Sequence, residues 1–333
     1  MGDAAQAAAV QEEMATIAQA ARALTRAPPP PANRLTPLPH KGEGSRSSAR
    51  AFGLYLIAPA VFLLLLVGLF PLIYSVIVSF QQITMTDVDT SFAGLANYKQ
   101  LFADTRLWES ILHTAIITLI ALPLELVFGL LMAQLFLEDM PGRPVFIALL
   151  MLPSVISPLI AGATWRLMFD NRYGPVNQII GWLWGEPTVL LWSIRPALVY
   201  PAILVCEVWQ WTPFMFLILL AALSNVDKSQ TESAQIDGAG FWTIFRKIVL
   251  PSIWPVMAIA ILIRSLDLVR VFDVIWALTE GGPGTMTETV SIYAYAQGFR
   301  QFETSYTAAM AFLIVALLTV LVTWAIRRMG IAK

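Results

Sequence analysis

From residue 51 onward, the chain consists of long apolar stretches separated by short polar ones. Six of these stretches are long enough to cross a bilayer core, which takes about 20 helical residues. A soluble α/β enzyme would instead alternate strand-length apolar runs with amphipathic helices, and the sequence has no such alternation. The pattern predicts an all-α integral membrane protein with six transmembrane helices, at 51–80, 108–136, 144–168, 197–223, 252–278 and 306–326.

Composition supports this prediction independently. Hydrophobic residues make up 57% of the chain and charged residues 13%, against roughly half and a quarter in ordinary soluble proteins. The polar connections are too short for a separate soluble domain, so residues 51–333 are expected to form one membrane domain. Residues 1–50 are rich in Ala and Gln and then in Pro, without the apolar core of a signal peptide. They are expected to form a disordered cytoplasmic tail.

The distribution of basic residues predicts the orientation. Lys and Arg favour the cytoplasmic side of a membrane, and an even number of spans places both termini on the same side. On the opposite side, the few basic residues are offset by Asp and Glu. The termini and the segment between the fourth and fifth spans are therefore expected in the cytoplasm, next to Arg46, Arg50, Arg143, Lys228, Arg246, Lys247, Arg327, Arg328 and Lys333.

The polar segment 226–251, between the fourth and fifth spans, carries its own structural signals. Asp227 followed by Gln230 is typical of a helix start, which predicts a short helix over 230–236. The pair Asp237-Gly238 lets the chain reverse, because glycine tolerates the left-handed conformation that ends a helix. A second helix is expected over 241–249, with Pro251 in the first turn of the fifth span. Two short helices around a glycine turn would make a rigid projection.

The same segment resembles the coupling-loop motif of ABC importer permeases. That motif reads Glu-Ala-Ala, Asp-Gly-Ala, Phe and then Leu-Pro, and Ser233 is the one departure within it, being still small enough for close packing. Val226-Asp227 replaces the family's Ile-Pro before the motif. The matching residues are Glu232, Ser233, Ala234, Asp237, Gly238, Ala239, Phe245, Leu250 and Pro251.

Two further blocks extend the resemblance over nearly all of the chain from residue 51. The run 92–98 with Trp108 is similar to the external loop after the first span of carbohydrate-uptake permeases, and 272–283 is similar to their signature after the fifth span. The resemblance is to maltose, glycerol-phosphate and polyol permeases. It implies a type I ABC importer permease fold, with 226–251 as the coupling loop.

The resemblance also implies a function and partners. The chain would be a non-enzymatic transport subunit in the bacterial cytoplasmic (inner) membrane, forming half of the translocation path for a sugar, polyol or related glycoside. A second permease would complete a heterodimer, and an extracytoplasmic solute-binding protein would deliver the solute. Two separate ATPase subunits would bind ATP and Mg²⁺, so no cofactor, metal or nucleic acid is expected on this chain. The lipid bilayer is its other partner.

The resemblance to maltose-type permeases also implies a substrate path, obtained by aligning their motifs with the matching motifs of this chain. A carboxylate, an amide, an indole and a guanidinium suit a polyhydroxylated solute. Arg264 would favour an anionic solute and Glu207 could neutralise it, so the sequence leaves the solute's charge open. The predicted path residues are Ser154, Pro158, Glu207, Gln210, Trp211, Arg264, Leu268 and Val271.

Ionisable residues inside spans are costly and usually face a cavity or a partner. Arg264 with Asp267, and Arg270 with Asp273, are spaced to lie on one helix face and could form structural ion pairs. Glu125, alone on the second span, could face the partner permease. The other two residues of this kind are Arg166 and Glu207.

Two other functional classes, an ion-coupled secondary transporter and an intramembrane enzyme, fit the sequence less well than an importer subunit. An ion-coupled secondary transporter could use Glu125 or Glu207 for coupling, but no inverted repeat is visible and such a carrier needs no docking loop. An intramembrane enzyme would need a nucleophile with its base, or metal ligands, around one cavity, and none can be assembled. The chain carries no GxxxxGK[ST] phosphate loop, and its single cysteine, Cys206, lies inside the fourth span.

Overall fold

The computed structural model describes residues 44–84 and 88–330 of the chain. Within the described residues the chain divides into two compact units, one ending at Val67 and one beginning at Gly68. The predicted disordered tail lies outside the described residues as far as residue 43. From there a helix, α2 (Gly44–Leu64), begins earlier than the predicted span. A π-helical turn, η1 (Leu65–Leu69), leads from it into α3 (Phe70–Ser79).

The second unit is built around three long helices, α5 (Thr105–Leu135), α9 (Pro196–Ser224) and α12 (Leu250–Val269), each in contact with the other two. Their close approach depends on small residues, as is usual for helices in membranes. At Gly129 of α5, an added Cβ would lie 2.7 Å from the Cβ of Met215 on α9. Another long helix, α15 (Thr304–Met329), packs on α3.

Five helices of the described chain are long and apolar enough to cross a membrane, and a bent pair would make a sixth span. This agrees with the predicted all-α, six-span architecture. The five are Tyr55–Ser79, Thr105–Leu135, Pro196–Ser224, Phe241–Val269 and Thr304–Met329.

The predicted third span, 144–168, is not one helix. It is divided into α6 (Arg143–Val155) and α7 (Pro158–Met168), which are bent by 94°. Proline explains the break, because it disfavours the helical conformation of the residue before it and has no N–H to donate. Ser157 and Ile156 are accordingly extended, with ψ near 135°.

The predicted fifth span, 252–278, also has the wrong bounds. The helix starts much earlier, at α11 (Phe241–Ile244), continues through a π-helical turn, η2 (Phe245–Val249), and ends with α12 at Val269. A separate helix, α13 (Asp273–Thr279), follows. Asp273 favours a new helix start there, because a carboxylate stabilises the positive end of the helix dipole.

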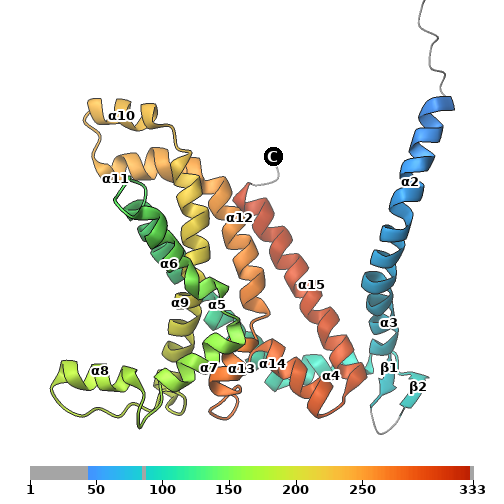
Figure 1. Ribbon diagram of the computed structural model, residues 1–333. Helices are drawn as coiled ribbons and strands as arrows, with labels where there is room; N and C mark the ends of the chain where they lie inside the picture. Colours follow the sequence, from blue (N-terminus) through green and yellow to red (C-terminus); the bar gives the residue numbers. More distant parts are fainter. Residues whose placement is uncertain (1–43, 85–87, 331–333) are drawn as a thin grey trace, which may run out of the picture. The chain divides into compact units, whose positions relative to one another are not determined.

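Shorter elements lie at both ends of the long helices of the second unit. Figure 1 shows α10 and α11 at one end and α4, α8, α13 and α14 at the other. Two antiparallel strands pair Gln82 with Asp89. The remaining elements are β1 (Gln81–Ile83), β2 (Val88–Phe92), α4 (Ala96–Ala103), α8 (Pro175–Trp184), α10 (Lys228–Ile236), α14 (Val290–Tyr295) and the π-helical turn η3 (Ala296–Arg300).

Candidate functional site

A cavity of about 320 Å³ lies at the two helix breaks of the second unit. The start of α7 forms one part of its wall, and the connection between α12 and α13 forms another. Interrupted helices at membrane depth are tolerated where they line a cavity, because their free backbone groups can then be satisfied. The lining residues are Pro158, Glu207, Trp211, Arg264, Asp267, Arg270, Val271, Phe272, Asp273 and Val274.

A buried triad of charged residues joins α5, α9 and α12 beside this cavity. Arg264 donates to both carboxylate oxygens of Glu125, from Nε at 2.7 Å and from Nη2 at 2.9 Å. Its Nη2 also donates to Oε1 of Glu207 at 2.5 Å. The three side chains are almost fully buried, so these hydrogen-bonded charges attract strongly and each would be costly to leave alone. The triad therefore fixes the guanidinium in one place.

The two ion pairs that the spacing within the fifth span allowed do not form. Arg264 pairs across helices with Glu125 and Glu207 instead of with Asp267, and Arg270 pairs with Asp267 at 2.6 Å instead of with Asp273. The helix ends at Val269, so the spacing of three residues from Arg270 to Asp273 no longer falls on one helix face. Glu125 is buried inside the helix bundle, so it does not face a partner permease.

The aromatic part of the cavity is also held by Arg264. Its guanidinium carbon lies 4.4 Å from the centre of the Trp211 ring, a geometry in which the charge is attracted to the ring face. Trp211 therefore presents its indole to the cavity in a fixed orientation.

The structure brings only part of the predicted substrate path to the cavity: Pro158, Glu207, Trp211, Arg264 and Val271. Ser154 donates to the carbonyl of Met151 one turn earlier in its own helix. Leu268 is fully buried. Gln210, expected beside the solute, donates to the carbonyl of Ile156 at 2.9 Å.

Five lining residues were not part of the predicted substrate path, and four of them follow the end of α12. The predicted stripe assumed a continuous helix through Val271, whereas the chain leaves the helix at Arg270. Charged residues in an apolar stretch had marked Asp267, Arg270 and Asp273 as facing a cavity or a partner, but had not placed them in the path. The five additional lining residues are Asp267, Arg270, Phe272, Asp273 and Val274.

The coupling segment 226–251 has the expected two helices and glycine turn. Asp227 caps α10 by accepting a hydrogen bond from the backbone N–H of Ser229 at 2.9 Å. Gly238 has φ of +78°, the left-handed conformation that glycine adopts without strain. Glu232, Ser233 and Ala234 lie on α10, and Asp237, Gly238 and Ala239 form the turn.

The second half of this segment differs from the prediction. Phe245 lies in the π-helical turn and Leu250 and Pro251 begin α12, so one uninterrupted helix joins the turn to the span. A π-helical turn beside Pro251 is expected, because proline cannot donate the next helical hydrogen bond. Ile236 and Trp242, on either side of the glycine turn, have exposed side chains. Because the helix from Phe241 to Val269 is uninterrupted, a displacement of α10 would be passed through the turn into α12.

A second polar network, which the sequence did not reveal, lies at the opposite end of the long helices. Arg106 donates to both carboxylate oxygens of Glu288, at 2.8 Å each. Asp104 caps α5 and also accepts hydrogen bonds from the hydroxyl groups of Tyr293 and Tyr306. These contacts tie the starts of α5 and α15 to α14.

Electrostatics at Asp104 favour the ionised form. Burial acts to raise the pKa of this carboxyl, but hydrogen bonds from Tyr293, Tyr306 and the backbone N–H groups of Leu107 and Arg106 outweigh burial and hold the pKa below its ordinary value. Burial and the bond to the carboxylate raise the pKa of Tyr293 to about 12.

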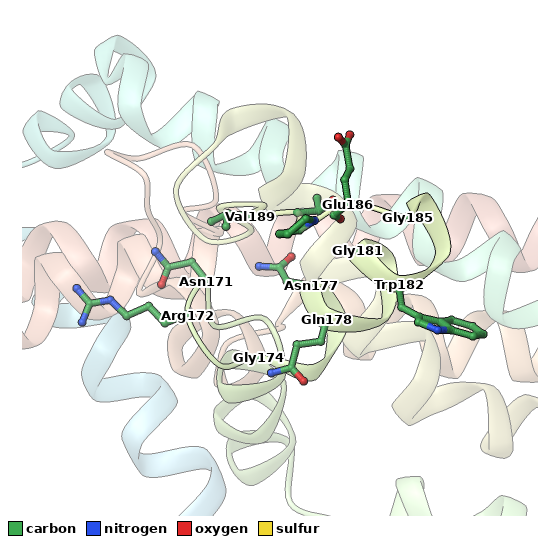
Figure 2. A pocket seen from close by; sticks show the side chains of 12 residues that line it. Asn171, Arg172, Gly174, Asn177, Gln178, Gly181, Trp182, Gly185, Glu186 and Val189 are labelled. Atoms are coloured by element: carbon green, nitrogen blue, oxygen red, sulfur yellow. Dashed lines mark hydrogen bonds between the residues drawn. The ribbon is translucent and has the colours of Figure 1, made fainter.

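A larger hollow, about 560 Å³, is lined by α8 and by the segments before and after it at the same end. Figure 2 shows Arg172 and Trp182 extending to opposite sides of it, with Asn177 between them. Asn177 accepts from the indole N–H of Trp192 at 2.9 Å and donates to the carbonyl of Leu190 at 3.0 Å. Its polar atoms are thereby occupied in holding the loop that follows α8.

Comparisons with known proteins identify the family of this fold. Residues 106–330 match the family model described as "Binding-protein-dependent transport system inner membrane component". A probable ABC transporter permease protein of Sinorhizobium fredii is 36% identical over 77% of this chain and 83% of its own length. The trehalose/maltose transport system permease protein of Thermococcus litoralis is 33% identical over 73% of this chain and 82% of its own length.

A solved structure shows the same fold at low identity. It is a bacterial alginate ABC transporter in complex with an alginate pentasaccharide-bound periplasmic protein. One of its chains is similar with a TM-score of 0.75 and 23% identity, covering 86% of this chain and 98% of that one. Together with the broken spans and the coupling segment, these matches show that the chain belongs to the family of binding-protein-dependent transport system inner membrane components, the permease subunits of ABC importers.

Proposed function

We propose that this permease forms half of the translocation path for a sugar, polyol or related glycoside. The observation that carries the proposal is the cavity at the two helix breaks, in which Glu207, Trp211 and Arg264 meet. Carboxylate and guanidinium groups hydrogen-bond to hydroxyl groups, and an indole packs on the CH groups of a sugar ring. Relatives named as trehalose/maltose and trehalose permeases support this solute class.

The proposed mechanism is alternating access powered by separate subunits. A second permease completes the path, and two ATPase subunits bind ATP and Mg²⁺ against the coupling segment of each permease. An extracytoplasmic binding protein delivers the solute. Closure of the ATPase pair moves α10, and the uninterrupted helix from Phe241 to Val269 carries that movement to Arg264 and the cavity.

The orientation that fits this mechanism places the coupling segment in the cytoplasm. Lys228, Arg246 and Lys247 lie in or beside α10 and η2, and basic residues favour the cytoplasmic side. Both termini are then cytoplasmic, in the bacterial inner membrane. The network around Asp104 and Glu288 would lie on the outer side, where the binding protein docks.

Reconstitution would test the proposal. The permease would be co-purified with its partner permease, ATPases and binding protein, and placed in proteoliposomes. ATP-dependent uptake of radiolabelled trehalose, maltose and glycerol would be measured in the wild type and in Trp211→Ala. We expect ATP-dependent uptake of a hydroxylated probe, lowered at least severalfold by Trp211→Ala while the basal ATPase rate is kept.

Trp182→Ala is the matched control, since this indole is exposed on α8, away from the cavity. Uptake driven by a proton or sodium gradient without ATP would overturn the proposal in favour of an ion-coupled carrier. Equal loss in the two tryptophan variants would remove the cavity from the solute path.

A further inference from the structure

We infer that the cavity accepts an uncharged, hydroxyl-rich solute and disfavours an anionic one, because Glu125 joins Glu207 in neutralising Arg264. The inference rests on the proposed function and narrows its solute class. Glu125 does not line the cavity. It is a positioning residue that acts through Arg264.

The geometry leaves Arg264 little capacity to bind an anion. Two of its three nitrogens, Nε and Nη2, donate to carboxylates at 2.5–2.9 Å. A solute carboxylate or sulfonate would recognise a guanidinium best through two parallel hydrogen bonds. Glu125 already occupies the Nε–Nη2 edge of Arg264, and Glu207 accepts from Nη2 on the Nη1–Nη2 edge, so neither two-nitrogen edge is free.

The charge balance leads to the same conclusion and does not depend on the location of any one proton. With Glu125 and Glu207 both ionised, the triad carries one negative charge, and with one of them protonated it is neutral. Neither state leaves a surplus positive charge. Around the cavity, Asp267 neutralises Arg270, and Asp273 adds a further carboxylate to the wall. An anionic solute would therefore enter a region of excess negative charge, where like charges repel.

One carboxylate oxygen of the triad, on Glu207, has no hydrogen-bond partner among the described residues, and a solute hydroxyl group could be that partner. Oε1 of Glu207 is bonded to Arg264, whereas Oε2 is buried and has no hydrogen-bond partner within the described chain. Buried polar atoms are nearly always hydrogen-bonded, so an unpaired one beside a cavity points to a missing donor. A solute hydroxyl group fits Oε2 in either protonation state, because it can donate to a carboxylate and accept from a carboxylic acid. An ionised Glu207 thus favours hydroxyl groups over anions.

The test measures the electrostatic potential of the cavity and can be done before the solute is identified. In the complete transporter, Cys206, the chain's single cysteine, is replaced by Ala. A reporter cysteine is introduced by Val271→Cys in the cavity wall. Its reaction rates with a cationic (trimethylammonium-ethyl) and an anionic (sulfonato-ethyl) methanethiosulfonate are followed by mass spectrometry of this chain. Their ratio is divided by the same ratio for a small thiol in solution.

We expect the normalised ratio to favour the cationic reagent by about tenfold, as a net negative charge within about 10 Å would produce. Glu125→Gln and Glu207→Gln change the shape little. Each should lower the ratio by a similar factor when both carboxylates are ionised, leave it unchanged when the two share a proton, and raise it in neither state. Glu109→Gln is the matched control, because Glu109 is an exposed carboxylate on the same helix as Glu125. Glu109→Gln should leave the ratio within about twofold of its value in the Val271→Cys protein.

Three outcomes would overturn the inference: a ratio that favours the anionic reagent, a ratio raised by either triad variant, or a reporter cysteine that neither reagent reaches. If the triad variants fail to fold, the ratio in the Val271→Cys protein with an intact triad still decides the sign of the potential. The labelling does not require uptake. A negative potential in a protein without ATP-driven uptake would therefore defeat the proposed function alone, and a positive potential in an active importer would defeat this inference alone.

Discussion

Gln210 on α9 donates a hydrogen bond from Nε2 to the carbonyl oxygen of Ile156, 2.9 Å away, at the break between α6 and α7. That carbonyl lies outside the helical ladder, because Ile156 and Ser157 before Pro158 are extended and the chain turns by 94°. A buried carbonyl without a donor costs about 1–3 kcal/mol. The side chain of a neighbouring helix therefore stabilises the bend that opens the cavity.

Gln210→Glu should destabilise the permease. The substitution puts an acceptor oxygen against the carbonyl of Ile156 in a buried site, and we expect a loss of about 1–3 kcal/mol. Thermal unfolding in detergent measures it. Gln178→Glu is the matched control, since Gln178 donates to the carbonyl of Tyr173 on an exposed surface where water can replace it. Equal effects of the two variants would contradict the role given to Gln210.

Gly238→Val should impair coupling. The residue has φ of +78°, where a β-branched side chain is strained by about 1–2 kcal/mol. We expect uptake and solute-stimulated ATPase activity in proteoliposomes to fall severalfold, with unchanged membrane insertion. Gly240→Val serves as control, because Gly240 has φ of −73° and, as at Gly238, no atom lies within 4 Å of an added Cβ. Normal coupling in the Gly238 variant would show that the shape of the turn does not matter.

Cysteine labelling should establish the orientation. Glu186, just after α8, and Lys228, at the start of α10, are both exposed, and α8 and α10 lie at opposite ends of the long helices (Figure 1). In sealed cells, a membrane-impermeant maleimide should label Glu186→Cys and spare Lys228→Cys until the cells are broken. The expectation follows from the preference of Lys and Arg for the cytoplasmic side. Labelling of position 228 from outside would reverse the orientation and remove the coupling segment from the cytoplasm.

The Asp104 network should make the permease sensitive to acid. The pKa of Asp104 is lowered in the folded protein, so ionised Asp104 stabilises the fold above its unfolded pKa. That contribution is lost as the pH falls through the folded value. Asp104→Asn should therefore lower the unfolding temperature at neutral pH, and its difference from the wild type should shrink in acid.

Asp139→Asn is the control for this pH series, because the Asp139 carboxylate is fully exposed. Unfolding temperatures from pH 3 to pH 7 supply the measurement. A difference between wild type and Asp104→Asn that stays constant over that range would show that Tyr293 and Tyr306 do not stabilise the charged form.

The sequence alone determined the features that depend on residues close to one another along the chain. Span lengths follow from runs of apolar side chains, which must cover about 30 Å of hydrocarbon whatever their partners. The coupling segment could be predicted with its capping Asp227 and the turn at Gly238, because capping and left-handed turns are decided within a few residues. The family resemblance rested on the same contiguous motifs.

Only the tertiary structure decided the breaks and the partners of the buried charges. Pro153 and Pro158 both lie in the third apolar stretch, yet the helix continues through the first and breaks before the second, where Gln210 supplies a donor. Arg264 meets Glu125, 139 residues away, because α5, α9 and α12 pack against one another. Spacing along one helix cannot reveal such a pair, since the penalty for a buried charge is relieved by whichever oppositely charged side chain the packing brings near.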